Sequence, residues 1–285
     1  MTFRTIKQTI PALETSDGAG VRIRRSIGQH QNIRLDPFLM LDEFGSDQPQ
    51  DYIAGFPSHP HRGFETVTYM IEGHMLHEDH LGNKGNLKNG GVQWMTAGRG
   101  IVHSEMPQQE SGQMRGFQLW LNLPAAEKMK PAGYRDIQPE EIPDVHLEGA
   151  RLKLIAGDIE VDGTMVPGAI SGGSTRPLYM DIHMEPGKAI TLPVSDQLNA
   201  MVYLYEGSAR LEHEVEDKPL KLAAATILGD GDQVRFESGA DGARLLLIAG
   251  KPINEPIVQY GPFVMNTREE IEQTLRDYRD GRLTA

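Results

Sequence analysis

The chain of 285 residues contains no cysteine. Its stability therefore owes nothing to disulfide bonds, and a metal ion bound by this protein would take histidine and carboxylate ligands. The absence of cysteine is also compatible with a reducing compartment.

Long apolar runs are absent as well. No stretch approaches the ~18 apolar residues of a membrane-spanning helix. Residues 1–14, MTFRTIKQTIPALE, lack the apolar core of a secretory signal and alternate like a strand. We therefore expect a cytoplasmic protein that does not associate with a membrane.

Basic side chains are fewer than acidic ones. Lys and Arg total 28 against 40 Asp and Glu, for a formal net charge of −12. Non-specific affinity for duplex DNA comes from cations that replace counterions on phosphate, so this charge argues against direct nucleic-acid binding.

Turn-forming residues are abundant, with 31 Gly and 18 Pro. Between the turn signals lie short apolar stretches, for example residues 66–71, 117–121 and 245–248. Short strands separated by frequent turns are typical of sandwiches and barrels, so we predict an all-β protein.

A weak internal repeat predicts two such units. Residues 68–73, TYMIEG, are followed by GGVQW at 90–94, and residues 202–207, VYLYEG, are followed by GDGDQV at 229–234. Each half then reads as strand, glycine turn, strand. We predict two β-barrels in tandem, at residues 1–130 and 146–285, joined by a Pro- and Glu-rich linker at 131–145.

One helix is expected, at the C-terminal end of the second unit. Thr267 and Glu270 have the spacing of a capping box, and Gly281 follows as a stop signal. Between them Ile271 and Leu275 recur at the spacing of one helical face.

Two short motifs predict a metal site. His59-Pro60-His61 and His103-Ser104-Glu105 each place two ligand-type residues at positions i and i+2, which point to the same face of a strand. Two adjacent strands would thus present three imidazoles and one carboxylate to one point. That donor set suits iron, nickel, copper, manganese or zinc rather than calcium or magnesium.

The longer segments around these motifs resemble the pirins, a branch of the cupin superfamily. The similar segments are HPHRGFETVTYMIEG at 59–73, QWMTAGRGIVHSE at 93–105, DPFLMLDEF at 36–44 and GPFVMNT at 261–267. The resemblance implies two cupin barrels and a metal in the first barrel, held by His59, His61, His103 and Glu105. We expect one divalent transition metal per chain, iron(II) first, with nickel, copper, manganese or zinc as alternatives.

Glu65 competes with Glu105 for the fourth ligand position. On an unbroken strand Glu65 would point the same way as His59 and His61, but Arg62-Gly63 can interrupt that strand. Spacing leaves both residues open, and the pirin resemblance favours Glu105.

The remaining histidines receive simpler interpretations. His77 and His80 flank Asp79 just before a Gly-Asn turn, which favours a hydrogen-bonded loop. The second half has no His-x-His motif, and its isolated residues His183 and His213 are interpreted as surface or hydrogen-bonded side chains.

The resemblance also implies an activity. Several pirins resemble quercetin 2,3-dioxygenases, so the expected reaction is the cleavage of a flavonol-like substrate by O₂ with loss of carbon monoxide, and Glu105 is the expected proton acceptor. The alternative is a regulatory protein whose metal redox state alters binding to a protein partner.

Overall fold

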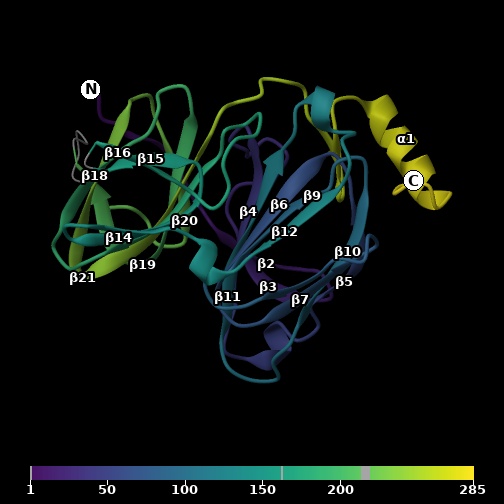
Figure 1. The fold of residues 1–285 in the computed structure, drawn as a ribbon, viewed down its shortest axis with the longest axis horizontal. Coiled ribbons are helices and arrows are strands. Elements are labelled where there is room, and N and C mark those ends of the chain that lie inside the picture. The colour runs from purple at the N-terminus through teal and green to yellow at the C-terminus, as the bar shows by residue number, and fades with distance from the viewer. Residues whose placement is uncertain (1, 162, 213–218) are drawn as a thin grey trace. The chain divides into compact units, whose positions relative to one another are not determined.

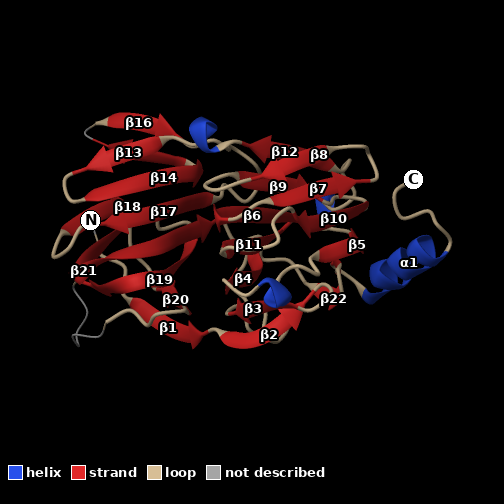
Figure 2. Ribbon diagram, turned by 90° about the horizontal axis from the view of Figure 1, so that it is seen from below, coloured by secondary structure: helices blue, strands red, loops and turns tan. Residues whose placement is uncertain are grey.

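Strands dominate the computed structural model, which describes residues 2–161, 163–212 and 219–285 (Figure 2). The chain forms two compact units. The N-terminal unit comprises Leu13–Arg34, Phe38–Pro139 and Ile253–Ala285, and the C-terminal unit comprises Met1–Ala12, Leu35–Pro37 and Glu140–Pro252. The predicted all-β class with one C-terminal helix is confirmed.

The main part of the N-terminal unit consists of two antiparallel sheets, and residues 258–265 add a short two-stranded sheet (Figure 1). In order, the seven strands of the larger sheet are β12 (Gly133–Ile137), β9 (Val92–Thr96), β6 (Phe64–Glu72), β11 (Met114–Asn122), β4 (Phe38–Ser46), β3 (Val21–Arg25) and β2 (Leu13–Asp17). The smaller sheet has the order β5 (Phe56–His61), β10 (Ile101–Pro107), β7 (Met75–Asp79) and β8 (Lys84–Leu87). Short 3₁₀ turns lie at Pro49–Asp51, Ala125–Glu127 and Pro139–Glu141.

Strand β10 shows how the sequence directs polar groups inward. Ile101, His103 and Glu105 are buried, whereas Val102 and Ser104 between them are only half buried. This is the period-2 alternation of a strand with one face toward the core. The inward face carries an imidazole and a carboxylate, so the inside of this unit is partly polar.

The predicted interruption after His61 is present. Strand β5 ends at His61, and β6 begins at Phe64. Gly63 has φ +91°, and a Cβ atom there would lie 1.9 Å from the carbonyl oxygen of Val264. Only glycine fits this backbone without displacing its neighbour. Because the strand is interrupted here, the alternation of side chains along β5 does not continue to Glu65 in β6.

The C-terminal unit is built on an eight-stranded antiparallel sheet. Its strands are β1 (Ile6–Pro11), β20 (Ala224–Leu228), β19 (Asn199–Leu211), β21 (Gln233–Gly250), β17 (Leu178–Met184), β14 (Ala150–Ala156) and β13 (Asp144–Leu147), with β18 (Ala189–Pro193) paired to β21. A separate hairpin joins β15 (Asp158–Val161) and β16 (Thr164–Pro167). The buried core of the C-terminal unit is apolar, with Leu152, Met180, Val202, Phe236 and Leu247 among its members.

The two units are not the contiguous halves that the sequence predicts. Strand β1 pairs with β20 of the C-terminal unit, so the first twelve residues do not belong to the N-terminal barrel. Residues from Ile253 onward belong to the N-terminal unit, where β22 (Val258–Tyr260) pairs with β23 (Phe263–Met265). Pairings between segments more than 200 residues apart leave no signal in local turn and strand patterns, so the predicted boundaries placed both chain ends in the other unit.

Helix α1 (Arg268–Arg279) confirms the predicted cap. Thr267 Oγ1 accepts from the Glu270 backbone N–H at 3.2 Å, and Glu270 Oε2 accepts from the Thr267 N–H at 2.8 Å. Ile271 packs with Phe263 and Met265 in a small core cluster, which docks the helix on β23. Among the described residues, no helix is both long and apolar enough to cross a lipid bilayer.

Candidate metal centre

The three predicted histidines come together inside the N-terminal unit. Strands β5 and β10 are antiparallel neighbours, and their register places His59 opposite His103 and His61 opposite Ile101. Ligand-type nitrogens of His59, His61 and His103 all lie within 4.8 Å of one another. The ring centroids are 4.4 Å apart for His59 and His103 and 5.0 Å apart for His61 and His103. Such proximity lets one ion contact all three rings.

The protonation of these rings fits a metal ion. His61 and His103 are 4% and 2% exposed, and burial, followed by the neighbouring His59 for His61 and by His61 for His103, lowers the pKa of each well below its usual value. Neutral imidazole is the form that binds a metal. His59 Nδ1 lies 2.8 Å from the Pro57 carbonyl and donates to it in the neutral tautomer that leaves Nε2 as the acceptor. His103 Nε2 is buried without a hydrogen-bond partner. A shared cation would satisfy such groups.

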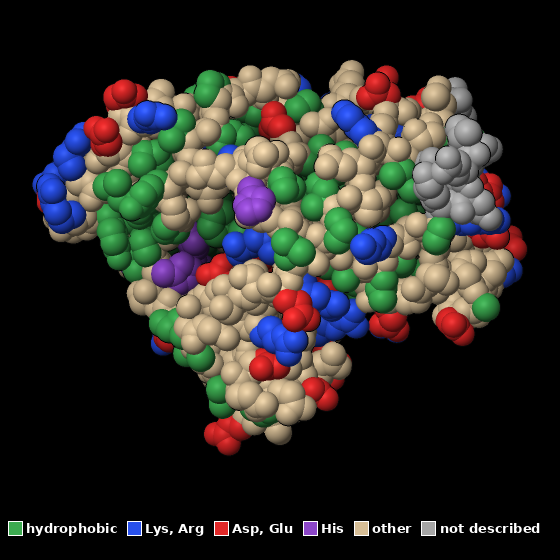
Figure 3. Space-filling view, turned by 180° about the vertical axis from the view of Figure 1, so that it is seen from behind, with side chains coloured by type: hydrophobic (Ala, Val, Ile, Leu, Met, Phe, Trp, Pro, Cys, Tyr) green, Lys and Arg blue, Asp and Glu red, His purple; other side chains and the backbone are tan. Residues whose placement is uncertain are grey.

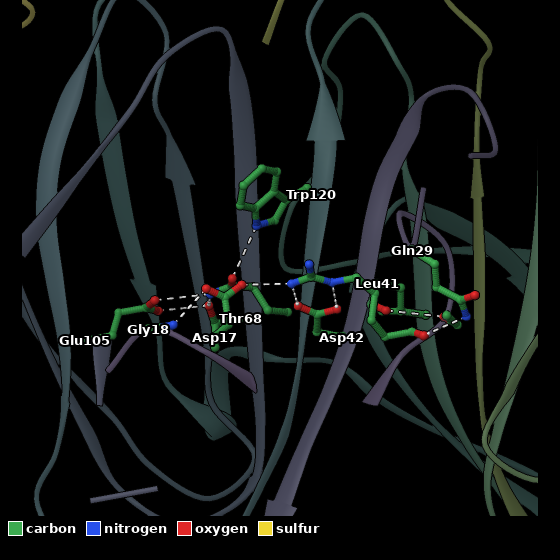
Figure 4. A network of polar contacts seen from close by, with 11 residues as sticks. Asp17, Gly18, Gln29, Leu41, Asp42, Thr68, Glu105 and Trp120 are labelled. Carbon is green, nitrogen blue, oxygen red and sulfur yellow. Dashed lines mark hydrogen bonds and ion pairs between the residues drawn. The ribbon is translucent and has the colours of Figure 1, made fainter. Parts of the chain in front are cut away.

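Glu105 lies on the same inward face, two residues after His103, and is 3% exposed. Its carboxylate accepts from Thr68 Oγ1 at 3.1 Å and from Gln118 Nε2 at 3.1 Å (Figure 4). Trp120 Nε1 donates in turn to Gln118 Oε1 at 3.2 Å. The carboxylate is not one of the three groups whose ligand atoms converge, so its place as fourth ligand stays a prediction.

Glu65 is committed to other partners. Its carboxylate accepts from Thr96 Oγ1 at 2.6 Å and from Trp94 Nε1 at 3.2 Å, and it pairs with Lys130 Nζ at 3.4 Å. These partners come from β9 and from the segment before β12, not from the strands that carry the histidines. Glu65 is therefore held by three partners on the side of β9 and β12.

A cavity of about 610 Å³ opens onto two of the histidines, His59 and His61. Its other walls combine apolar side chains with a few polar groups, and they include Leu39, Met40, Phe56, Trp120, Gln118 and Arg25. In a space-filling view, histidine side chains lie within a hollow of the surface (Figure 3). Volume and lining are those of a small-molecule site, which is mostly apolar with a few placed polar groups.

One wall of the cavity contains a paired cation. Arg25 donates to the two carboxylate oxygens of Asp42 at 2.8 and 2.7 Å and to Asp17 at 2.8 Å (Figure 4). Burial raises the pKa of Asp42 to about 6, although the hydrogen bonds from Arg25 act in the opposite direction. The wall therefore presents hydrogen-bonding groups without an unpaired positive charge.

His77 is the site residue that the sequence interpretation missed. It lies in strand β7 rather than in a loop, it is 1% exposed, and its Nδ1 is 3.4 Å from His103 Nδ1. Its position two residues before Asp79 on one strand face was the available signal. The loop prediction is correct for His80, which follows β7 and accepts from the Val102 N–H at 3.2 Å.

In the C-terminal unit, His183 is hydrogen-bonded as predicted. Its Nε2 lies 2.9 Å from Asp181 Oδ2. His213 falls outside the described residues. Within the described part of the chain, no other group of histidine and carboxylate ligand atoms converges as His59, His61 and His103 do.

Fold and site define a protein of two β units, one of which holds three converging histidines, two of them buried, beside a cavity. Residues 20–121 match the family model described as Pirin, and residues 179–284 match the Pirin C-terminal cupin domain. The chain belongs to the pirin family, and its two units contain cupin domains.

Similar proteins cover almost the whole chain. A Pseudomonas aeruginosa protein named "Putative quercetin 2,3-dioxygenase" is 53% identical over 282 residues, 98% of each chain. Human pirin is 39% identical over 98% of this chain and 93% of its own. A crystal structure of quercetin 2,3-dioxygenase from Acinetobacter baumannii superimposes with a TM-score of 0.89, at 32% identity and 99% coverage of both chains.

Proposed function

We propose that this protein is a metal-dependent dioxygenase of the pirin type that cleaves flavonol-like substrates with O₂. One observation carries the proposal: three imidazoles converge, and two of them, His59 and His61, line a cavity of about 610 Å³ that can hold a small aromatic molecule. The names of the similar proteins from P. aeruginosa and A. baumannii support the same reaction.

The proposed cofactor is one divalent transition metal per chain, iron(II) first, held by His59, His61, His103 and Glu105. The buried, unpartnered Nε2 of His103 and the convergence of the three rings fit such an ion. When bound, the ion supplies Lewis acidity and coordination positions for substrate and O₂.

The protein's own side chains would bind and orient the substrate. Leu39, Met40, Phe56 and Trp120 provide apolar walls that favour a planar aromatic molecule and exclude water. Gln118 lines the same cavity and donates to Glu105. It is therefore placed to connect the substrate with the proton acceptor.

Glu105 is the proposed proton acceptor for the substrate hydroxyl. Its two oxygens are oriented by Thr68 and Gln118, which donate to different oxygens. Two fixed donors keep a carboxylate in one rotamer, and this preorganisation is required of a base that must lie within hydrogen-bond reach of its proton.

The test is turnover of quercetin in air by protein loaded with a defined metal. We expect loss of the flavonol absorbance together with release of carbon monoxide. Metal-stripped protein and His61→Ala are the controls, and both should be inactive. Equal loss of absorbance in the controls would mean autoxidation. No turnover with iron, nickel, copper or manganese restored would overturn the proposal in favour of a regulatory protein with a protein partner.

A further inference from the structure

His77 and Asp79 lie on the strand that borders the other edge of β10. The register of β7 with β10 places Asp79 opposite His103 and His77 opposite Glu105. Residues opposite each other in a pair of strands point to the same face. Both side chains therefore point inward, toward the residues that form the candidate metal centre.

The side chains of His103, His77 and Asp79 contact one another in sequence. His103 Nδ1 lies 3.4 Å from His77 Nδ1, and His77 Nε2 lies 3.4 Å from Asp79 Oδ2. The His77 ring stacks on Tyr134 with centroids 4.1 Å apart and planes 13° apart, which fixes its plane. Asp79 is itself fixed, because its carboxylate accepts from the backbone and side-chain amides of Asn83 at 3.0 and 2.8 Å.

Each contact determines which nitrogen carries a proton. An ionised carboxylate only accepts, so His77 Nε2 donates to Asp79. In neutral His77 the other nitrogen, Nδ1, is then an acceptor, and His103 Nδ1 must donate to it. Neutral His103 consequently carries its lone pair on Nε2, and this is the buried atom that lacks a hydrogen-bond partner.

We propose that His77, anchored by Asp79, is a positioning residue that fixes the tautomer and ring orientation of His103 so that Nε2 faces the metal. The ligand atoms of His59, His61 and His103 converge, and His77 is not a member of that set. This inference rests on the proposed metal site and is independent of the flavonol activity. Partners of this kind contribute 10- to 100-fold to metal affinity.

The experiment measures the dissociation constant of Co²⁺ by titration of metal-stripped protein. His77→Phe keeps a flat ring against Tyr134 but removes the acceptor, and we expect affinity to fall about 10- to 100-fold. His77→Asn places an amide oxygen near the position of Nδ1, so we expect affinity within a few-fold of the original protein. His80→Phe is the matched control, because it removes a hydrogen bond to β10 without touching His103, and its affinity should be unchanged.

Co²⁺ X-ray absorption adds a readout that a merely structural role would not move. We expect the same number of imidazole ligands in the original protein and in His77→Asn. Loss of one imidazole in His77→Asn would overturn the proposal by making His77 a ligand. Unchanged affinity in His77→Phe, or equal losses in the Phe and Asn variants, would overturn it as well.

Two further outcomes are separable. If His77→Phe does not fold, Asp79→Asn provides the test. An amide can both donate and accept, so this variant weakens the preference of His77 for one tautomer. The affinity for Co²⁺ should then fall, and unchanged affinity would contradict the proposal. If the original protein binds no Co²⁺, nickel or iron, the metal site itself fails, whereas unchanged His77 variants of a metal-binding protein refute only this inference.

Discussion

Arg62 Nη1 donates to the Asp277 carboxylate at 2.8 Å, which joins the residue after His61 to helix α1. The guanidinium also donates to the Leu283 carbonyl at 2.9 Å and to the Arg99 carbonyl. Its side chain is only 4% exposed. One buried cation thus connects the end of strand β5 with the C-terminal segment, more than 200 residues away.

Replacing Asp277 with Asn should lower the free energy of unfolding by about 2 kcal/mol, because the buried Arg62 guanidinium loses its ionised partner and keeps only a neutral amide oxygen as acceptor. Denaturant unfolding monitored by circular dichroism measures the change. Asp280→Asn is the control, since the Asp280 carboxylate pairs with Arg279 and Arg282 at the surface, and exposed pairs contribute little to stability. Equal losses in the two variants would contradict a special role for Arg62.

The contribution of Asp277 to the free energy of unfolding should disappear at acid pH. The hydrogen bond from Arg62 holds the pKa of Asp277 below its usual value. A carboxyl whose pKa is lower in the folded than in the unfolded state adds stability above the unfolded pKa of ~3.9 and loses it as pH falls through the folded pKa. We expect the stability difference between the original protein and Asp277→Asn to be constant from pH 7 to about 5 and to shrink below about 4. A difference that grows in acid would show that the sign is wrong.

Each chain should bind one metal ion, and the binding should stabilise the fold. His59→Ala, His61→Ala and His103→Ala should each abolish stoichiometric binding, because each removes one of the three imidazoles that converge among the described residues. At a free metal concentration 100 times the dissociation constant, the stabilisation is about 2.7 kcal/mol. Elemental analysis and thermal unfolding test this. His183→Ala, in the other unit, should retain the metal; two ions per chain would contradict a single centre.

Matched substitutions distinguish the role of Glu105 from that of Glu65. Glu105→Gln should weaken metal binding and abolish turnover, since it removes the carboxylate on the inward face of β10. Glu65→Gln should retain metal binding and lose only modest stability, because it disturbs the contacts with Trp94, Thr96 and Lys130. Metal titration of both variants decides between them: loss of affinity in Glu65→Gln alone would assign the fourth ligand to Glu65.

The orientation of the paired histidines could be predicted from the local sequence pattern. A period of two on a strand is a property of the backbone, so His59-x-His61 had to present two rings to one face. The capping box at Thr267 is equally local, because it depends on hydrogen bonds within a few residues. The positive φ of Gly63 is also a local preference of glycine, although the close approach of Val264 to Gly63 is a distant contact that the sequence does not reveal. Apart from that contact, these features were therefore predictable without any knowledge of distant contacts.

Tertiary pairing decided the rest. The sequence determined that the ligand-type residues occur in i, i+2 pairs, but the register of β10 between β5 and β7 set His103 against His59 on one side and brought His77 near it on the other. The sequence also determined a strand near the N-terminal end and a helix near the C-terminal end, whereas only the structure assigned them to units, with β1 beside β20 and α1 beside β23. The physical reason is the same in both cases: a strand's own residues fix the direction of its side chains, whereas its neighbours are selected by burial and backbone hydrogen bonds summed over the whole chain.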